Sequence, residues 1–286
     1  MKNLGFYVTT YCISQIDNDR LIRCIESVRL IYPNNNIVII DDNSPYQIEL
    51  KIDDNMKIVK SEVNQIGELL PYYHNSKYDT FDQYLTIHDS MVFKKEIPDK
   101  YFEYDFVPLW HFDTNMKCKY IIGSAFKSIC KQIKNGKIIY KIYNNPNCKP
   151  CCDCGLEIYD TKTKQPIKLL DKPIDTENNK IFYNWVGCFG LSAIVKNTYI
   201  KSIITKYQLD QCWNIFNNRI NRMCGERLFG IIALLENQNS IQSINGNIMD
   251  HLNKFNYDGD TIIPITAILE LYKNYDSCLI KTWVGR

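Results

Sequence analysis

The stretch Ile37-Val38-Ile39-Ile40-Asp41-Asp42-Asn43-Ser44-Pro45 decides the fold. Its apolar, β-branched first half is typical of a strand that is covered on both faces, as in the centre of a parallel sheet. The polar residues that follow predict a turn at the carboxyl end of that strand. Because ligands of open α/β sheets bind at the carboxyl ends of the strands, this turn is also the first candidate for a site.

The segments on either side of this strand alternate between strand and helix. β-Branched and aromatic runs predict strands, and apolar residues at helical spacing predict helices, the first of them capped by Asp17, Asn18 or Asp19. The expected strands cover residues 6–11, 57–60 and 84–87, and the expected helices cover 21–32 and 67–77. This order predicts an α/β fold with a doubly wound, mostly parallel mixed sheet.

The remainder of the chain is less regular, and we expect one domain with an inserted irregular segment. The insertion would cover residues 95–180, between a first half at 1–94 and a second half at 181–286. Within the insertion the pattern predicts a helix and one hairpin, and beyond it helices and short strands. The expected helices of these regions are 119–134, 196–206, 219–236 and one near 265–274.

Composition and charge exclude several classes of protein. The 286 residues are 45% hydrophobic, which rules out wholesale disorder, and 34 basic residues nearly balance 32 acidic ones, which argues against a nucleic-acid partner. No apolar run approaches the roughly 20 residues of a membrane-spanning helix. The first six residues lack the pattern of an export signal, so we expect a soluble, cytoplasmic protein.

The chain contains 12 cysteines, and without an export signal we do not expect disulfides. Six of them lie among apolar neighbours and are expected to be buried thiols: Cys12, Cys24, Cys188, Cys212, Cys224 and Cys278. Cys148, Cys151, Cys152 and Cys154 form a cluster that suggests structural zinc. Four thiolates within seven residues would strain to surround one ion, so two of them together with Cys118 or Cys130 is an alternative arrangement.

Acidic residues follow two of the predicted strands. Asp41 and Asp42 end one strand and Asp89 ends another, so they are expected at the same edge of the sheet. Carboxylates there can accept hydrogen bonds from a base or ribose and hold a divalent metal, which describes a nucleotide-diphosphate site. The alternative is that residues 41–44 form only a turn. The Gly-rich phosphate loops of kinase-like and dinucleotide enzymes are absent from the sequence.

These motifs resemble the start of a GT-A glycosyltransferase, close to the family 2 type. A strand ending in Thr10, a long helix and an apolar strand closing in Asp41-Asp42-Asn43-Ser44 fit that pattern. Where the family carries D-x-D, the chain reads Ile87-His88-Asp89, and only the last Asp is kept. The resemblance implies that Asp41 or Asp42 binds the nucleoside and that Asp89 binds Mn or Mg, with His88 as a substitute polar contact.

Three later segments extend the resemblance. Trp185, Gly187 and Gly190 fall in a segment similar to the Gly-rich acceptor side, for which a strand with a bulge is the alternative. Glu226 stands in an acidic motif that would open a late helix and supply the catalytic base. Its alternative role is to complement the helix dipole from the first turn. His251 falls where many of these enzymes complete the metal shell.

The main hypothesis is therefore an inverting glycosyltransferase that moves a sugar from a nucleotide-diphosphate sugar, most simply a UDP-sugar, to a hydroxyl of a glycan or protein acceptor. A catalytically silent GT-A-like module that binds glycans or a partner protein is the rival hypothesis. A nucleotidyltransferase would need a Gly-rich loop after the first strand, which the chain lacks. The abundance of Ile, Asn, Lys and Tyr suggests a large AT-rich DNA virus as the source, and hence the host cytoplasm.

Overall fold

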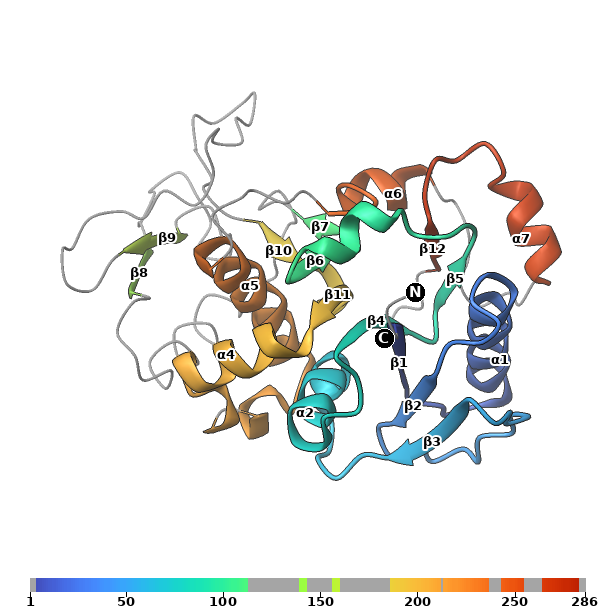
Figure 1. Cartoon of the computed structure of the whole chain (residues 1–286), viewed down its shortest axis with the longest axis horizontal. Coiled ribbons are helices and arrows are strands. Elements are labelled where there is room, and N and C mark those ends of the chain that lie inside the picture. Colours follow the sequence, from blue (N-terminus) through green and yellow to red (C-terminus); the bar gives the residue numbers. More distant parts are fainter. Residues whose placement is uncertain are drawn as a thin grey trace.

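The structure is a computed structural model that describes residues 4–112, 139–142, 156–159, 186–211, 213–236, 243–254 and 264–282. Its centre is a six-stranded sheet in the order β3-β2-β1-β4-β11-β6 (Figure 1). The strands are β1 (Leu4–Thr10), β2 (Ile37–Asp41), β3 (Met56–Lys60), β4 (Gln83–His88), β6 (Phe106–Pro108) and β11 (Ala193–Lys196). β1 to β4 are parallel, whereas β11 is antiparallel to both β4 and β6. The predicted α/β, mostly parallel mixed sheet is confirmed.

The register of the sheet brings the carboxyl ends of three strands together. Thr10 at the end of β1 pairs with Asp41 at the end of β2, and Thr9 pairs with His88 at the end of β4. The chain leaves β1 towards β2 on one side, while β4 lies on the other side of β1. The β1–β4 border is thus the point where strand order reverses, and ligands of doubly wound sheets bind at such a point.

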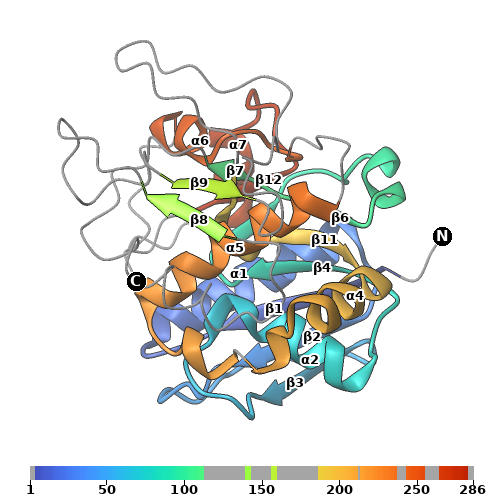
Figure 2. The same cartoon turned by 90° about the vertical axis from the view of Figure 1, so that its left-hand side faces the viewer.

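Helices cover both faces of the sheet. α2 (Leu70–Tyr78) and α4 (Asn197–Tyr207) lie on one face, and α1 (Gln15–Ile31) lies on the other (Figure 2). α5 (Arg219–Glu236) packs against β10 (Gly187–Cys188) and the 3₁₀ turn η4 (Phe189–Leu191). The sequence-predicted bounds of these helices hold closely, except at the start of α1.

The first helix begins earlier than predicted, and its cap is Ser14 rather than Asp17, Asn18 or Asp19. The Ser14 side chain accepts a hydrogen bond from the Asp17 backbone amide, and the Asp17 carboxylate accepts one from the Ile13 amide at 2.9 Å. This reciprocal pair satisfies two amides that would otherwise lack partners at the helix start. Asp17 and Asn18 therefore lie inside the helix, where both are buried.

Shorter elements surround this frame. The strands are β5 (Met91–Phe93), β7 (His111–Phe112), β8 (Ile139–Ile142), β9 (Leu156–Tyr159) and β12 (Leu279–Lys281), and the helices are α6 (Ile248–Lys254) and α7 (Ile265–Leu271). The 3₁₀ turns are η1 (Gly67–Leu69), η2 (Asp99–Glu103), η5 (Leu209–Gln211) and η6 (Trp213–Phe216). β12 pairs with β5 and so brings residues 279–281 beside the segment that follows β4, while the antiparallel β8–β9 pair agrees with the predicted hairpin.

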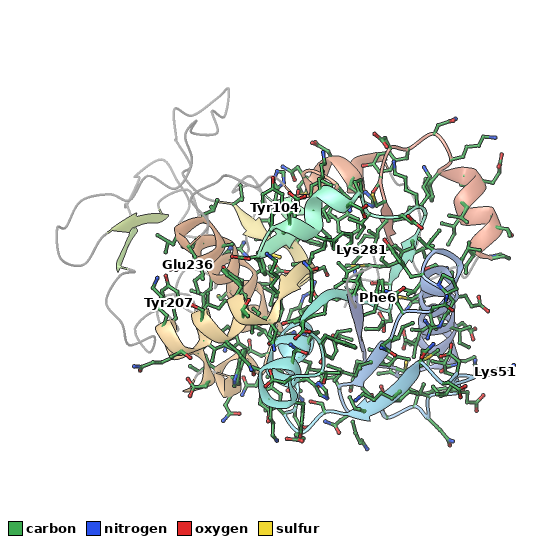
Figure 3. The ribbon with its side chains drawn as sticks, viewed as in Figure 1. Phe6, Lys51, Tyr104, Tyr207, Glu236 and Lys281 are labelled. Atoms are coloured by element: carbon green, nitrogen blue, oxygen red, sulfur yellow. The ribbon has the colours of Figure 1, made fainter. Side chains whose placement is uncertain are left out.

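The core lies between the sheet and its helices and includes the fully buried Phe6 of β1, which is labelled in Figure 3. Five of the cysteines expected to be buried thiols are buried and form no disulfide among the described residues: Cys12, Cys24, Cys188, Cys224 and Cys278. Cys212, the helix expected at 119–134 and the cysteine cluster expected to hold zinc lie outside the described residues. Among the described residues, the helices are too short or too polar to cross a membrane.

Candidate functional site

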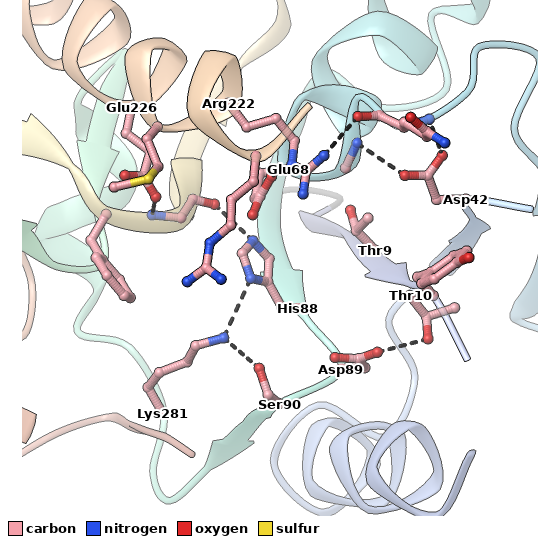
Figure 4. Close-up of a pocket in the computed structure, with 17 residues that line it drawn as sticks. Thr9, Thr10, Asp42, Glu68, His88, Asp89, Ser90, Arg222, Glu226 and Lys281 are labelled. Atoms are coloured by element: carbon pink, nitrogen blue, oxygen red, sulfur yellow. Dashed lines mark hydrogen bonds and ion pairs between the residues drawn. The ribbon is translucent and has the colours of Figure 1, made fainter. Parts of the chain in front are cut away.

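A pocket of about 400 Å³ lies at the carboxyl ends of β1, β2 and β4. Its floor comes from Thr9, Thr10 and the residues that follow β4, and α5 and η4 form its opposite wall (Figure 4). Asp42 and Lys281 also line the pocket. It therefore occupies the edge of the sheet where the sequence predicts a site, at the reversal of strand order.

Asp89 and Thr10 meet across the β1–β4 border. The Thr10 hydroxyl donates a 2.8 Å hydrogen bond to Oδ2 of Asp89, and the Asp89 backbone amide donates to the Thr9 carbonyl at 3.2 Å. Both side chains are largely buried and line the pocket. Two residues predicted for the nucleotide site are thus in direct contact, and the Asp89 carboxylate has a fixed orientation.

The two adjacent acids of the β2 turn have different surroundings. Asp42 lines the pocket, and its carboxylate accepts hydrogen bonds from the backbone amides of Gln65 and Gly67 at 2.9 and 3.1 Å. Burial raises the pKa of Asp42, and these amides oppose the shift. Asp41 instead accepts the Ser44 amide at 2.8 Å, which is the turn contact of the alternative interpretation, and it does not line the pocket.

His88 connects the end of β4 to η4. Its Nε2 lies 2.7 Å from the Gly190 carbonyl oxygen. Because a carbonyl can only accept, Nε2 carries a proton, and Nδ1 of the neutral ring faces the Lys281 ammonium at 3.4 Å. Burial and the nearby Lys281 hold the pKa of His88 well below its usual range, so the ring is neutral. His88 therefore sets the position of the Gly190 peptide.

Gly190 itself lines the pocket and has a φ of +59°, in the left-handed region. A Cβ at this position would lie 2.8 Å from Cε1 of His88, so both its backbone and its surroundings require glycine. The next carbonyl, that of Leu191, accepts hydrogen bonds from the Tyr72 hydroxyl at 2.6 Å and the Thr86 hydroxyl at 2.8 Å. The turn is consequently anchored to both α2 and β4.

Glu226 reaches the pocket from α5. Oε1 of Glu226 accepts a 2.7 Å hydrogen bond from the Gly190 backbone amide. Burial, reinforced by the charge of Glu68, raises the pKa of Glu226 to about 8, against the opposing effects of Arg227, the Gly190 amide and Lys281. Since α5 begins at Arg219, Glu226 lies two turns inside the helix. The expectation that this acidic motif opens the helix is therefore wrong, and so is the interpretation that Glu226 complements the helix dipole from the first turn.

Lys281 is a pocket residue that the sequence analysis missed. It ends β12, is 7% exposed, and donates a hydrogen bond from its ammonium to the Ser90 hydroxyl. Figure 3 shows it well inside the molecule, and Figure 4 shows its ammonium directed at His88 and Ser90. An apolar run, Cys278-Leu279-Ile280, ending in a lysine was the available signal, but nothing local relates it to β4.

Two further charged residues on the pocket wall were also missed. Arg222 of α5 forms a 3.0 Å ion pair with Glu68 of η1 and donates to the Gln65 carbonyl at 2.9 Å. Arg222 thereby ties the helix that carries Glu226 to the turn that Asp42 holds. Arg222 and Gln65 are 157 residues apart along the chain, so only the folded topology brings them together.

Of the residues expected on the acceptor side, Gly190 lines the pocket but Gly187 does not. Gly187 lies in β10, outside the pocket lining, and a Cβ on it would lie 2.0 Å from the Phe112 ring. A Cβ on Gly230 of α5 would lie 2.2 Å from the Val186 carbonyl oxygen. These glycines let helix and strand approach closely, which is a packing role. Trp185 lies outside the described residues.

His251 does not join Asp89. Its ring is fully buried between Trp110 and Tyr275, and its Nε2 accepts a 3.1 Å hydrogen bond from the Lys281 backbone amide. In the neutral ring the proton then lies on Nδ1, so neither nitrogen offers a lone pair to a metal. His251 is also absent from the pocket lining. The arrangement gives it a structural role beneath β12.

The pocket residues do not fit the Mn or Mg expected at Asp89. The first position of the D-x-D pattern is Ile87, a fully buried core residue. The Lys281 ammonium contacts the residues on both sides of Asp89 in the chain, and a divalent cation there would be repelled. Within the described ranges, no three His, Cys, Asp or Glu side chains gather as a metal site.

Comparisons with known proteins give remote structural similarity alone. No family model matches the chain, and no curated protein matches it in sequence. The galactosyltransferase LgtC, solved with donor and acceptor sugar analogs, aligns over 98% of this chain and 87% of its own at 7% identity and a TM-score of 0.41. A structure of an active-site mutant of LgtC aligns over 98% and 88% at 7% identity and a TM-score of 0.43.

A third structure, residues 1–349 of TarS from S. aureus, aligns over 71% of this chain and 49% of its own at 15% identity and a TM-score of 0.30. Similarity at these levels establishes no family. The function is therefore inferred from the residues of the pocket.

Proposed function

We propose that the chain is a glycosyltransferase of GT-A type, which moves a sugar from a nucleotide-diphosphate sugar to an acceptor hydroxyl with inversion at the anomeric carbon. The observation that carries the proposal is that acidic side chains lie on two opposite sides of one pocket. Asp42 and Asp89 stand at the strand ends, and the Glu226 carboxyl stands on the facing helix (Figure 4). The first group suits a nucleotide and the second suits a hydroxyl nucleophile.

The donor would lie along the carboxyl ends of the strands. Asp42 is a hydrogen-bond acceptor for the base or ribose at the β2 end, held in place by two backbone amides. Asp89 is fixed by Thr10 at the reversal point, where the diphosphate would pass. A UDP-sugar is the first donor to test. The sequence resemblance of residues 6–45 to GT-A enzymes supports the same orientation.

Glu226 is the group that would activate the acceptor. As the hydroxyl oxygen bonds to the anomeric carbon, the bond from that carbon to the phosphate oxygen breaks, and the nucleoside diphosphate leaves with the electron pair. The hydroxyl proton passes to the Glu226 carboxylate. A pKa raised to about 8 makes Glu226 a stronger base than an ordinary glutamate, provided that it is ionised. The Gly190 amide orients this carboxylate.

This arrangement supports inversion as part of the proposal. One base removes the proton of a hydroxyl that attacks from the side opposite the leaving group, which is a single displacement and inverts the configuration. The acceptor would approach between Glu226 and Phe189, both of which line the pocket. A hydroxyl of a glycan or of a protein side chain fits this chemistry.

Donor binding is the direct test. Thermal-shift measurements on the full chain with UDP-, GDP- and CMP-sugars should show stabilisation by one nucleotide class, because a ligand that binds the folded state raises its stability by mass action. Transfer to a glycan or peptide acceptor would then be followed by release of the nucleoside diphosphate. Binding without any transfer or donor hydrolysis would favour a catalytically silent module, and no binding at all would remove the proposal.

A further inference from the structure

The proposed function assigns no role to Lys281, which is the buried lysine of the pocket. Three basic residues line the pocket: Arg219, Arg222 and Lys281. Arg222 is engaged by Glu68 and the Gln65 carbonyl, and Arg219 is exposed at the start of α5. Lys281 is buried and comes from the last described strand, β12. Its ammonium lies against the residues at the carboxyl end of β4.

The position of the Lys281 ammonium is defined by its contacts. It donates to the Ser90 hydroxyl and faces Nδ1 of His88 at 3.4 Å, so it is held against both chain neighbours of Asp89. Its charge lowers the pKa of His88 and opposes the rise in the pKa of Glu226. The ammonium thus contacts the residues at the carboxyl end of β4, and its charge also acts on Glu226.

We propose that the Lys281 ammonium, in place of a divalent metal ion, binds the diphosphate of the donor and stabilises the negative charge that develops on it as the sugar leaves. This inference rests on the proposed glycosyltransferase function and specifies its leaving-group side. The bond changes are those given above: the electron pair of the breaking carbon–oxygen bond goes to the phosphate oxygen that the ammonium contacts. Preorganised charge of this kind lowers the energy of a transition state in which charge appears.

The surroundings of Lys281 support this role over a purely structural one. A hydroxyl and a neutral imidazole contact the ammonium and fix its direction before any ligand binds. His88 stays neutral, so it does not compete as a second cation. Asp89, which follows His88 in the chain, supplies only one carboxylate to this part of the pocket. Tight binding of a divalent ion depends on several charged oxygen ligands.

The test distinguishes binding of the β-phosphate from binding of the rest of the nucleotide, and the contribution of a metal ion from that of Lys281. UDP, UMP, GDP and GMP are titrated calorimetrically into the wild-type chain, once with EDTA and once with Mn. The nucleotide that binds is then titrated into Lys281→Met, Lys281→Arg and Lys196→Met. Lys196 is the matched control, because it forms its ion pair with Asp105 away from the pocket.

The wild type should bind the diphosphate more tightly than the monophosphate, to the same extent in EDTA as in Mn. Lys281→Met should lose about 10- to 100-fold in affinity for the diphosphate, the usual effect of a lost hydrogen bond to a charged group, with little change for the monophosphate. Lys281→Arg should recover part of the loss, and Lys196→Met should match the wild type.

Two results would overturn the inference while leaving the proposed function intact: diphosphate binding that requires Mn, or a preference for diphosphate that survives in Lys281→Met. The EDTA comparison uses the wild type alone, so it decides the question even if Lys281→Met fails to fold. Absence of binding by every nucleotide to the wild type, with and without Mn, would overturn the proposed function and the inference together.

Discussion

Nε2 of His88 lies 2.7 Å from the carbonyl oxygen of Gly190, and this hydrogen bond joins the two halves of the pocket. On one side His88 ends β4, next to Asp89, and on the other the amide of Gly190 donates to Glu226. Gly190 thus holds the proposed base and is itself held by the strand that carries the nucleotide side. Disturbing either partner should change the position of Glu226.

The first prediction concerns that link. Gly190→Ala should reduce the free energy of unfolding by about 2–4 kcal/mol, because alanine is strained at a φ of +59° and its Cβ would meet Cε1 of His88 at 2.8 Å. It should also lower transfer activity, since both His88 and the amide that orients Glu226 must move. Chemical denaturation and transfer assays measure the two effects.

Gly246→Ala is the matched control for this variant. Gly246 has a φ of +79°, so alanine there carries a similar backbone strain, of about 1–2 kcal/mol, but a Cβ would have nothing within 4 Å. Equal destabilisation by the two substitutions would show that contact with His88 costs nothing. Normal activity in Gly190→Ala would show that the turn does not position the base.

Much of this arrangement follows from local sequence, and some of it does not. The apolar run at 37–40 and the turn after it predicted β2 and its place in the sheet, because a strand that is buried on both faces has consecutive apolar residues. β11 and β6 were not predicted. They are short, and their pairing joins segments that are far apart in the chain, so no periodicity within either segment reveals it.

In the site, too, some residues could be predicted from local sequence and others could not. Thr10, Asp42 and Asp89 could be proposed because each lies at or directly after the end of a recognisable strand, and strand ends of a parallel sheet gather at one edge. Lys281 could not, since only the pairing of β12 with β5 brings it beside the end of β4. His251 shows the opposite error, because a histidine in the expected sequence position proved to be a buried hydrogen-bond acceptor.

The second prediction concerns catalysis by Glu226. Glu226→Gln keeps an oxygen that can accept the Gly190 amide but cannot take up a proton at neutral pH. It should bind donor as the wild type does and lose transfer by about 100-fold or more, the usual contribution of a general base. Donor titration and initial rates test the two statements, and undiminished transfer would remove Glu226 from the mechanism.

The third prediction is the pH dependence of the same step. Only ionised Glu226 can accept a proton, and its pKa is about 8, so kcat/KM should rise about tenfold per pH unit from pH 6 and level off above pH 8. Glu226→Gln should lack this rise in its residual activity. A wild-type profile that is flat between pH 6 and 8 would contradict the raised pKa or the assigned role.

The fourth prediction is a stability effect of that carboxyl. Its pKa is raised from 4.5 to about 8 in the folded chain, so the stability that the protonated form provides is fully present below about pH 4.5 and is lost as pH rises through 8. Glu226→Gln escapes this loss, because its side chain stays neutral. At pH 9 the variant should be more stable than the wild type by roughly 3–5 kcal/mol, given about 1.4 kcal/mol per pKa unit.

Denaturation at two pH values measures this difference. Near pH 4.5 the wild type and Glu226→Gln should be alike, since the carboxyl is then protonated in the folded chain. A difference that is the same at pH 4.5 and pH 9 would mean that ionisation of Glu226 is not its source.

The last prediction compares two adjacent threonines that both line the pocket. The Thr10 hydroxyl donates to Asp89 at 2.8 Å, whereas the Thr9 hydroxyl has no hydrogen-bond partner among the described residues. Thr10→Val should cost about 1.5–3 kcal/mol of stability and weaken donor binding, because a buried carboxylate loses a donor. Thr9→Val removes a hydroxyl that makes no hydrogen bond among the described residues, so the stability of this variant should equal or exceed that of the wild type.

Each substitution replaces one hydroxyl by a methyl group of similar size, so the pair of variants isolates the effect of the hydrogen bond from that of packing. Denaturation curves and donor titrations of both variants test this, and equal effects of the two substitutions would show that the Thr10–Asp89 contact contributes neither to the fold nor to the site.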